Sequence, residues 1–229
     1  RKESSAASDV YKRQDEMLEN LKTVDKIIEI YKKNKNFDLI YRKKQFVDKV
    51  GDLSFIISPK SFFQVNKYNT SLLYDTAKQM MNADANDRIL DLYCGIGTTT
   101  MYIGNGNNTI GVEVVKDAVK DANQNKKLNN LESIQFIEEK SENVVGKLTK
   151  EHFDIILVDP PRKGMDEKVV DAIIKSTAKK LVYISCDPAT LARDLKMLTE
   201  NGFAVIDVKL VDMFAKTMHV ETVVLMSRK

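Results

Sequence analysis

The stretch Asp91-Leu-Tyr-Cys-Gly-Ile-Gly97 ends an apolar run that begins at Arg88, and three threonines follow it. Short runs of aliphatic and β-branched residues bounded by turn residues are typical of buried strands. Two glycines separated by one residue allow the backbone to turn sharply and to approach a ligand closely. The stretch therefore predicts a strand that ends in a ligand-binding loop, at the edge of the sheet where such loops gather.

From this stretch to the last residue, the chain alternates between apolar runs and amphipathic segments. Strands are expected at residues 88–93, 109–115, 133–137, 153–158 and 180–185. Helices are expected at residues 116–128, 167–178 and 189–201. This alternation predicts an α/β fold, with a buried parallel sheet and helices on both faces. Two closing strands, 204–210 and 220–226, have no helix between them, so one should be antiparallel, as in the Rossmann-like sheet of S-adenosylmethionine-dependent methyltransferases.

Upstream of the stretch the pattern is weaker. Residues 15–41 carry apolar residues at roughly helical spacing, and residues 49–58 alternate like one strand closed by Pro59. A helix is expected at 69–81, with one apolar face made of Leu72, Leu73, Thr76, Ala77 and Met80.

Three segments are expected along the chain. Residues 61–229 should form a class I methyltransferase domain, and residues 15–60 the remnant of a smaller central or RNA-binding domain. Residues 1–14 lack apolar periodicity and resemble a translated sequencing adapter, so we expect a non-native or disordered tail there. The natural protein is then expected to begin near Asp15 and to continue upstream of this sequence.

Composition narrows the class of protein. The chain has 229 residues, 43% of them hydrophobic and 30% charged, which is typical of a soluble globular protein. No apolar run approaches the roughly 20 residues of a membrane helix, and no signal peptide is recognisable, so a cytoplasmic protein without membrane contacts is expected. Two cysteines and two unpaired histidines predict neither a disulfide framework nor a metal site. The net charge of +3 is compatible with a nucleic-acid partner.

An acidic residue strengthens the prediction of a nucleoside site. Glu113 ends the second strand, close to the spacing at which an acidic residue accepts ribose hydroxyls after a glycine-rich loop. A dinucleotide-binding loop usually carries a third glycine, whereas Thr98 and its neighbours follow Gly97 here. S-adenosylmethionine has no pyrophosphate that would require that glycine, so the loop favours this cofactor.

Four further motifs define the other side of the expected site. They are Ser61-Phe-Phe-Gln-Val-Asn66, Asp159-Pro-Pro-Arg-Lys-Gly164, Ser185-Cys-Asp-Pro-Ala-Thr-Leu-Ala-Arg-Asp194 and His219-Val-Glu-Thr-Val223. Together they resemble the bacterial RNA (uracil-5-)methyltransferases, which modify transfer RNA or 23S ribosomal RNA. The resemblance runs from about Gly51 to the last residue, and the motif that begins at Ser185 is its most specific part.

The resemblance implies a role for individual residues. It makes Cys186 the nucleophile and Glu221 the general base. It also implies a set of residues that contact the cofactor or the target base: Gln64, Tyr93, Gly95, Gly97, Thr98, Glu113 and Asp159. Lys140 is a poor match for the acceptor that the family carries at its position. Candidate contacts to RNA phosphates are Arg162, Lys163 and Arg193.

Physical chemistry supports the catalytic pair. Cys186 precedes an expected helix, whose dipole would favour the thiolate. Glu221 opens an apolar strand, which is compatible with a buried carboxyl group of raised pKa. Cys94 is interpreted as a packing residue within the loop. Phe62 and Phe63 could stack on a nucleotide, although core packing is their expected use.

Three alternatives remain open. The RNA could be 23S ribosomal RNA, which the resemblance favours, or transfer RNA. The chain could methylate another nucleobase atom, which would need no cysteine. It could also be a truncated RNA-binding module without turnover. The cysteines that hold an iron–sulfur cluster in some family members are missing, so no cluster is expected.

Overall fold

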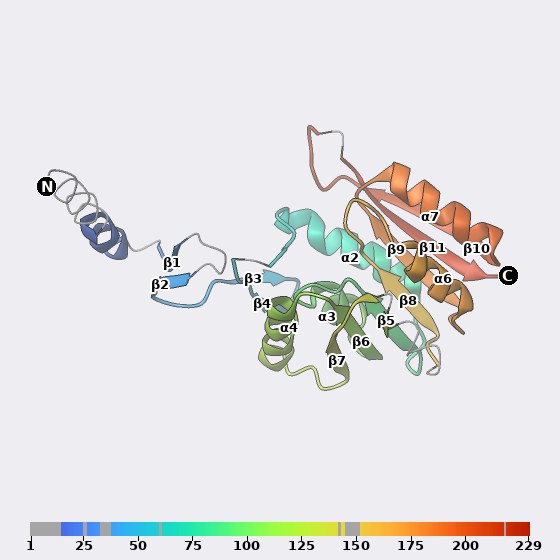
Figure 1. Cartoon of the computed structure of the whole chain (residues 1–229), viewed down its shortest axis with the longest axis horizontal. Coiled ribbons are helices and arrows are strands. Elements are labelled where there is room, and N and C mark those ends of the chain that lie inside the picture. The colour runs from blue at the N-terminus through green and yellow to red at the C-terminus, as the bar shows by residue number, and fades with distance from the viewer. Residues whose placement is uncertain are drawn as a thin grey trace, which may run out of the picture. The chain divides into compact units, whose positions relative to one another are not determined.

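The computed structural model describes residues 15–24, 27–32, 38–59, 61–141, 143–144, 152–217 and 219–229 (Figure 1). The chain divides into two compact units, Arg1–Val47 and Asp48–Lys229. The expected tail at residues 1–14 lies outside the described residues. Among the described helices, none is long and apolar enough to cross a lipid bilayer.

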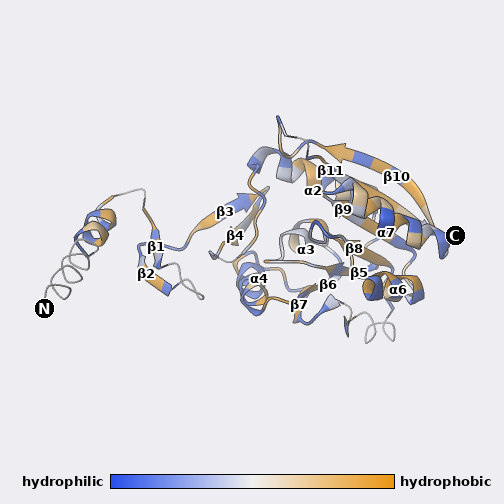
Figure 2. Ribbon diagram, turned by 45° about the horizontal axis from the view of Figure 1, so that its top comes forward, coloured by the Kyte–Doolittle hydropathy of each residue, from blue (hydrophilic) through white to orange (hydrophobic). Residues whose placement is uncertain are grey.

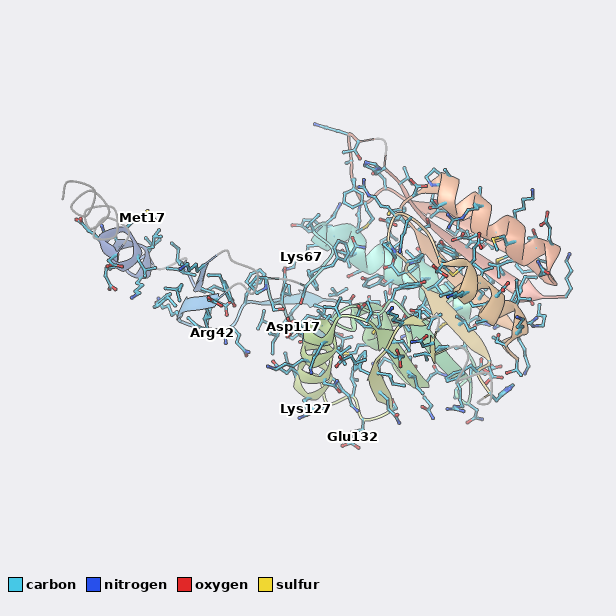
Figure 3. All side chains as sticks on the ribbon, viewed as in Figure 1. Met17, Arg42, Lys67, Asp117, Lys127 and Glu132 are labelled. Atoms are coloured by element: carbon cyan, nitrogen blue, oxygen red, sulfur yellow. The ribbon has the colours of Figure 1, made fainter. Side chains whose placement is uncertain are left out.

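The smaller unit contains a short helix and a hairpin. Residues 15–22 are helical, so the helical pattern extends less far than its spacing predicted. The following residues form β1 (Glu29–Lys32) and β2 (Asp38–Arg42), which pair antiparallel. The Arg42 Nε atom donates to Glu29 Oε1 at 2.7 Å, which ties the ends of the hairpin together (Figure 3).

The larger unit is built on a seven-stranded sheet in the order β10-β11-β9-β8-β5-β6-β7. Its strands are β5 (Arg88–Leu92), β6 (Asn108–Glu113), β7 (Ile134–Glu138), β8 (Ile155–Val158), β9 (Lys180–Ser185), β10 (Phe203–Val211) and β11 (Glu221–Arg228). β11 runs antiparallel to β9 and β10, as expected for the closing pair, and the other neighbours are parallel. Figure 1 shows β10 and β11 at one edge and β7 at the other. The chain passes to β6 on one side of β5 and later to β8 on the other, so ligands are expected at the carboxyl end of β5.

Both faces of the sheet are covered by helices. Side chains alternate along each strand: Ile89 packs in one apolar cluster, whereas Leu90 and Leu92 pack in the other. One face is covered by α2 (Lys67–Met81), α3 (Thr98–Ile103) and α4 (Lys116–Leu128), and the other by α6 (Glu167–Lys175) and α7 (Pro188–Glu200). Figure 2 shows that the strands between these layers are largely hydrophobic. The α/β fold with two helical layers is therefore confirmed.

Local sequence features explain the ends of α4 and the absence of a predicted helix at α3. α4 carries Asp117 in its first turn and Lys127 in its last, charges that complement the helix dipole (Figure 3). α3 has only six residues, too few for a periodic apolar pattern, and no helix was predicted there.

The single strand predicted at residues 49–58 is wrong. The chain forms a hairpin, β3 (Val47–Val50) and β4 (Leu53–Ile56), because Gly51 adopts a φ of +56° and reverses the chain. Val50 and Phe55 are buried in the core, and Asn125 of α4 and Asn129, which caps its C-terminus, bond the β4 backbone. The larger unit therefore begins at Asp48, and the hairpin packs with the sheet although its sequence was grouped with the preceding segment.

The apolar face expected on α2 also differs. The buried residues of this helix are Thr70, Leu73, Tyr74, Ala77 and Met81, while Leu72 is 54% exposed. The predicted face is rotated toward solvent relative to the buried one. Leu72 and Leu73 are adjacent, and an apolar face with helical spacing can be drawn through either of them.

Candidate active site

A cavity of about 690 Å³ is lined by the loops that follow β5, β6, β8 and β9 and by the first residue of β11. It is lined by most of the residues that the sequence singled out: Gln64, Tyr93, Gly95, Thr98, Glu113, Asp159, Arg162, Lys163, Cys186 and Glu221. Gly97 and Arg193 are not among its lining residues. The structure thus brings residues from six separate segments of the chain to one edge of the sheet.

The loop after β5 combines three left-handed backbone positions. Tyr93, Gly95 and Gly97 have φ values of +67°, +55° and +86°. A Cβ atom at Gly97 would lie 2.6 Å from Met101 Cε and 2.6 Å from Phe136 Cζ, so packing as well as backbone conformation requires glycine. A Cβ atom at Gly95 would meet nothing within 4 Å, so this glycine leaves open space on the cavity wall.

Asp91 anchors this loop from beneath. Its side chain is fully buried, and Oδ2 accepts hydrogen bonds from the hydroxyls of Thr99 (2.7 Å) and Thr100 (2.6 Å). Its Oδ1 atom has no hydrogen-bond partner among the residues that the structure describes. Burial raises the pKa of Asp91 to about 7, and the carboxylate of Glu113 adds to the increase.

Glu113 connects the loops after β5 and β6. Its Oε2 atom accepts from the Gly95 amide at 3.1 Å, and its Oε1 atom accepts from the Val115 amide at 2.8 Å. The carboxylate is thereby held on the cavity wall beside the open space at Gly95. An acceptor in this place suits the hydroxyls of a ribose.

These features fit S-adenosylmethionine. The cavity has the volume of a small-molecule site, and its wall offers an open glycine and a fixed carboxylate.

Cys186 lies between β9 and α7 and is half-buried. Burial raises the pKa of its thiol, the carboxylates of Glu221 and Asp159 raise it further, and the guanidinium of Arg162 opposes them. The expectation that the dipole of α7 favours the thiolate stays a prediction, and burial and the two carboxylates act against it. The Asp187 carboxylate already caps α7, accepting from the amides of Ala189 and Thr190 at 3.1 and 2.9 Å.

Glu221, the first residue of β11, lies close to Cys186, which follows the last residue of β9. Thr222 of β11 pairs with Ser185 of β9, so Glu221 and Cys186 flank the last pair of this antiparallel ladder. Glu221 is 4% exposed, and burial raises its pKa while Arg162 lowers it. A buried carboxyl group of raised pKa was expected at this position.

Asp159 completes the group of acidic side chains. Burial raises its pKa well above the usual range, and the carboxylates of Glu221 and Asp91 add to this. Acidic groups that share a desolvated cavity repel one another, so each raises the pKa of its neighbours.

The three candidate RNA contacts differ in their surroundings. The exposed Arg162 and Lys163 line the cavity. The guanidinium of Arg193 instead bonds the Asp194 carboxylate and the carbonyls of Lys163 and Met165. Because these bonds engage Arg193, the structure does not support its prediction as a free phosphate contact.

Tyr74 of the cavity wall was not singled out from the sequence, and Phe62 lies elsewhere than its expected use predicted. Tyr74 of α2 is buried, and its hydroxyl donates to Thr98 Oγ1 at 3.2 Å. Phe62 is 72% exposed and lines the cavity, so the prediction that it packs in the core is wrong. Phe63 does pack against Phe55, with ring centroids 6.1 Å apart. Tyr74 could have been found from the spacing of Thr70, Tyr74 and Ala77, but no sequence signal separates the two phenylalanines.

Comparison with known proteins agrees with this arrangement. The sequence profile described as tRNA (Uracil-5-)-methyltransferase matches residues 6–229. A Bacillus cereus protein described as an uncharacterized RNA methyltransferase is 44% identical over 193 residues, which are 83% of this chain and 42% of that protein. A similarly described protein of Caldanaerobacter subterraneus is 42% identical over 198 residues, or 85% of this chain and 44% of its own length. The chain thus spans less than half of the length of these relatives.

Two solved structures are similar in fold. The tRNA (uracil-54, C5)-methyltransferase of Pyrococcus abyssi, in complex with S-adenosyl-L-homocysteine, has a TM-score of 0.74 and 29% identity, covering 86% of this chain and 48% of that one. A SAM-dependent methyltransferase from Agrobacterium tumefaciens has a TM-score of 0.63 and 16% identity, covering 89% of this chain and 78% of that one.

The strand order and the loop after β5 define the class: this is the fold of the S-adenosylmethionine-dependent methyltransferases. The extent of the profile match identifies the group within that class. The chain belongs to the tRNA (uracil-5-)-methyltransferase family.

Proposed function

We propose that this chain carries the catalytic site of an enzyme that methylates C5 of a uridine in RNA, with S-adenosylmethionine as the methyl donor. The observation that supports this most directly is the position of Cys186 and Glu221 beside each other, in a cavity that a glycine loop and Glu113 also line. A thiol and a buried carboxyl group are the two groups that this chemistry requires.

The cofactor would be held by the loop after β5 and by Glu113, with Gln64, Tyr93, Thr98 and Asp159 on the same cavity wall. When bound, S-adenosylmethionine supplies an electrophilic methyl group. The tight turn at Gly97 and the bonds of Glu113 to the two loops fix the cavity wall in advance, which lowers the entropic cost of near-attack geometry.

The first step belongs to Cys186. Its sulfur adds to C6 of the uracil, and the electrons of the C5–C6 double bond move to O4, giving an enolate. C5 thereby becomes nucleophilic enough to take the methyl group. The guanidinium of Arg162 is the nearby positive charge that favours the thiolate form of Cys186.

The last step belongs to Glu221. Its carboxylate takes the proton from C5, the C5–C6 double bond re-forms, and the bond between Cys186 and C6 breaks. Desolvation raises the pKa of Glu221, which makes its carboxylate a stronger base than an exposed one.

RNA must present an unstacked uracil, since C6 is not accessible within a stacked helix. Phe62 offers an exposed aromatic face at the cavity, and Arg162 and Lys163 offer positive charges beside it. These side chains are suited to hold a base and its phosphates.

Two classes of RNA are candidates for the substrate. The resemblance of the motifs favours 23S ribosomal RNA. The family description and the name of the archaeal relative instead refer to transfer RNA. Methylation of a 23S ribosomal RNA transcript and of a transfer RNA pool, measured side by side, separates them.

The proposal is tested by incubating the chain with RNA and cofactor labelled in the methyl group, then digesting the RNA to nucleosides. We expect label in 5-methyluridine and none after Cys186→Ala. Label in another nucleoside that survives Cys186→Ala would support methylation of a different atom. Cofactor binding without transfer to either RNA would support a binding module without turnover.

A further inference from the structure

The turn after β8 is fixed to the first half of α7. The Thr190 hydroxyl donates to the carbonyl of Arg162 at 3.0 Å. The Arg193 Nη2 atom donates to the carbonyls of Lys163 at 3.0 Å and Met165 at 3.1 Å. Three backbone carbonyls of one short segment are therefore held by side chains of one helix.

The contact between the turn and the helix is close. Within the turn, the Gly164 amide donates to the Pro161 carbonyl at 2.8 Å, and Gly164 has a φ of +76°. A Cβ atom at Gly164 would lie 2.6 Å from Arg193 Nη2 and 2.7 Å from Asp194 Oδ2. Only glycine lets the turn lie this close to the two side chains.

Asp194 is the centre of this contact. Its carboxylate is fully buried: Oδ1 accepts from Arg193 Nε (2.8 Å) and Nη2 (2.6 Å), and Oδ2 accepts from the Met165 amide and the Tyr183 hydroxyl, both at 2.8 Å. A buried carboxylate is tolerated only when its oxygens are satisfied in this way. We name Thr190, Arg193 and Asp194 the α7 clamp.

The turn after β8, which the α7 clamp holds, places two positively charged side chains on the cavity wall. Arg162 and Lys163 line it, and the guanidinium of Arg162 lowers the pKa of both Cys186 and Glu221. The carboxylates of Glu221 and Asp159 face the same thiol and act in the opposite direction. Arg162 is therefore the charge that counters two carboxylates at Cys186, and its effect depends on its distance from the sulfur.

We propose that Arg193 and Asp194 are positioning residues, which hold the turn after β8 so that Arg162 lies beside Cys186. Arg193 does not line the cavity and acts through the backbone of the turn. The inference rests on the proposed function, in which Cys186 is the nucleophile. It replaces the predicted role of Arg193 in phosphate binding with a role in holding a neighbouring arginine.

The test measures the alkylation rate of Cys186 by iodoacetamide as a function of pH, without RNA or cofactor, by mass spectrometry of its peptide. Only the thiolate reacts, so the profile reports the charge around the sulfur. Cys94 is 3% exposed, and its slow alkylation serves as an internal check that each variant is folded. Lys196→Gln, an exposed change elsewhere on α7, is the matched control.

We expect Arg162→Gln to slow alkylation of Cys186 near neutral pH about three- to tenfold and to move the profile to higher pH. Arg193→Gln should reproduce most of this effect, and Lys196→Gln none of it. In the double variant, Arg193→Gln should add nothing to Arg162→Gln, because it acts only through Arg162.

The inference is overturned if Arg193→Gln leaves the profile unchanged in a folded protein, or if the two losses multiply. Should Arg193→Gln expose Cys94, Thr190→Val removes the bond to the Arg162 carbonyl together with the bonds of the same hydroxyl to Asp187, and an unchanged profile in that variant overturns the inference equally. No methyl transfer is measured in this experiment, so the two proposals can fail separately. The proposed function can fail while Arg193 still positions Arg162, and the positioning role can fail while the chain still methylates RNA.

Discussion

Cys94 and Cys186 each follow a central strand of the same sheet, and both line the same cavity, but their surroundings differ. Cys94 lies in the loop after β5, where it is 3% exposed, and burial together with Asp91 and Glu113 raises its pKa. Cys186 lies after β9, half-buried, with a guanidinium acting against the carboxylates. The loop after β5 is built from tight backbone turns, whereas the first residue after β9 presents a half-buried thiol to the cavity.

The comparison teaches that position at a strand end does not make a cysteine reactive. Both thiols have raised pKa values in this state. The difference lies in access and in Arg162, the positive charge that acts on Cys186. A nucleophilic cysteine needs access to the substrate and a nearby positive charge. An inaccessible thiol cannot reach a substrate carbon, and a thiol without a positive charge to stabilise its thiolate stays protonated.

The largest expected effect separates the two cysteines by activity. Cys186→Ser should lower methyl transfer to RNA by about 10³-fold or more, because serine cannot replace the thiolate as nucleophile. Cys94→Ser, the matched change in the loop after β5, should lower it less than about tenfold. Rates with saturating labelled cofactor measure both, and equal losses in the two variants would contradict the division of roles.

A second effect concerns Glu221, the proposed base close to Cys186. Glu221→Gln should lower turnover about 10²- to 10⁴-fold, because the C5 proton is no longer removed. The methylated RNA should remain bound to Cys186, so a covalent complex should accumulate on a denaturing gel. Glu138→Gln, at the exposed end of β7, is the control and should form no such complex. Loss of activity without accumulation would place Glu221 before the methyl transfer.

A third effect concerns the backbone turns of the loop after β5. Gly97→Ala should lower the free energy of unfolding by about 2–4 kcal/mol, from the strained φ and the overlap with Phe136 and Met101. Gly106 has a φ of +99° and open space around it, so Gly106→Ala should cost only the backbone part, about 1–2 kcal/mol. Denaturant unfolding of both variants measures the difference. Equal costs would mean that packing does not require Gly97.

A fourth effect is a pH dependence that arises beneath the same loop. Since the pKa of Asp91 is raised to about 7, its contribution to stability is complete at low pH and is lost as the pH rises toward and through 7. Asp91→Asn should therefore flatten the decline in unfolding free energy between about pH 4 and pH 8, by roughly 1.4 kcal/mol for each unit of altered pKa. An unchanged slope in urea titrations would show that Asp91 does not carry this proton.

Much of the fold could be predicted because its signals are local. Apolar β-branched runs identified the strands of the sheet, and β5 and β9 begin where the sequence placed them. The hairpin at Gly51 was missed because alternation looks the same on both sides of a two-residue turn. α2 was rotated because adjacent leucines define two overlapping stripes. In both cases tertiary packing decides between local patterns of equal strength.

The site was less predictable because it is assembled from distant segments. The motifs placed Cys186, Glu221 and Arg162 at the correct edge of the sheet. They did not predict the direction in which the surrounding charges and burial shift the pKa of the Cys186 thiol. That direction depends on which carboxylates are buried around it, which only the folded chain determines. The engagement of Arg193 by Asp194 could not be read either, since an arginine at an active edge also suits a phosphate.

The most direct test of the central claim is covalent capture by RNA that carries 5-fluorouridine in place of uridine. We expect an adduct in the presence of S-adenosylmethionine, because fluorine at C5 cannot leave as a proton and the bond from sulfur to C6 persists. Peptide mapping should place the RNA on Cys186 in the wild-type chain and in Cys94→Ser, with no adduct in Cys186→Ser. An adduct on Cys94, or one that survives Cys186→Ser, would contradict the account.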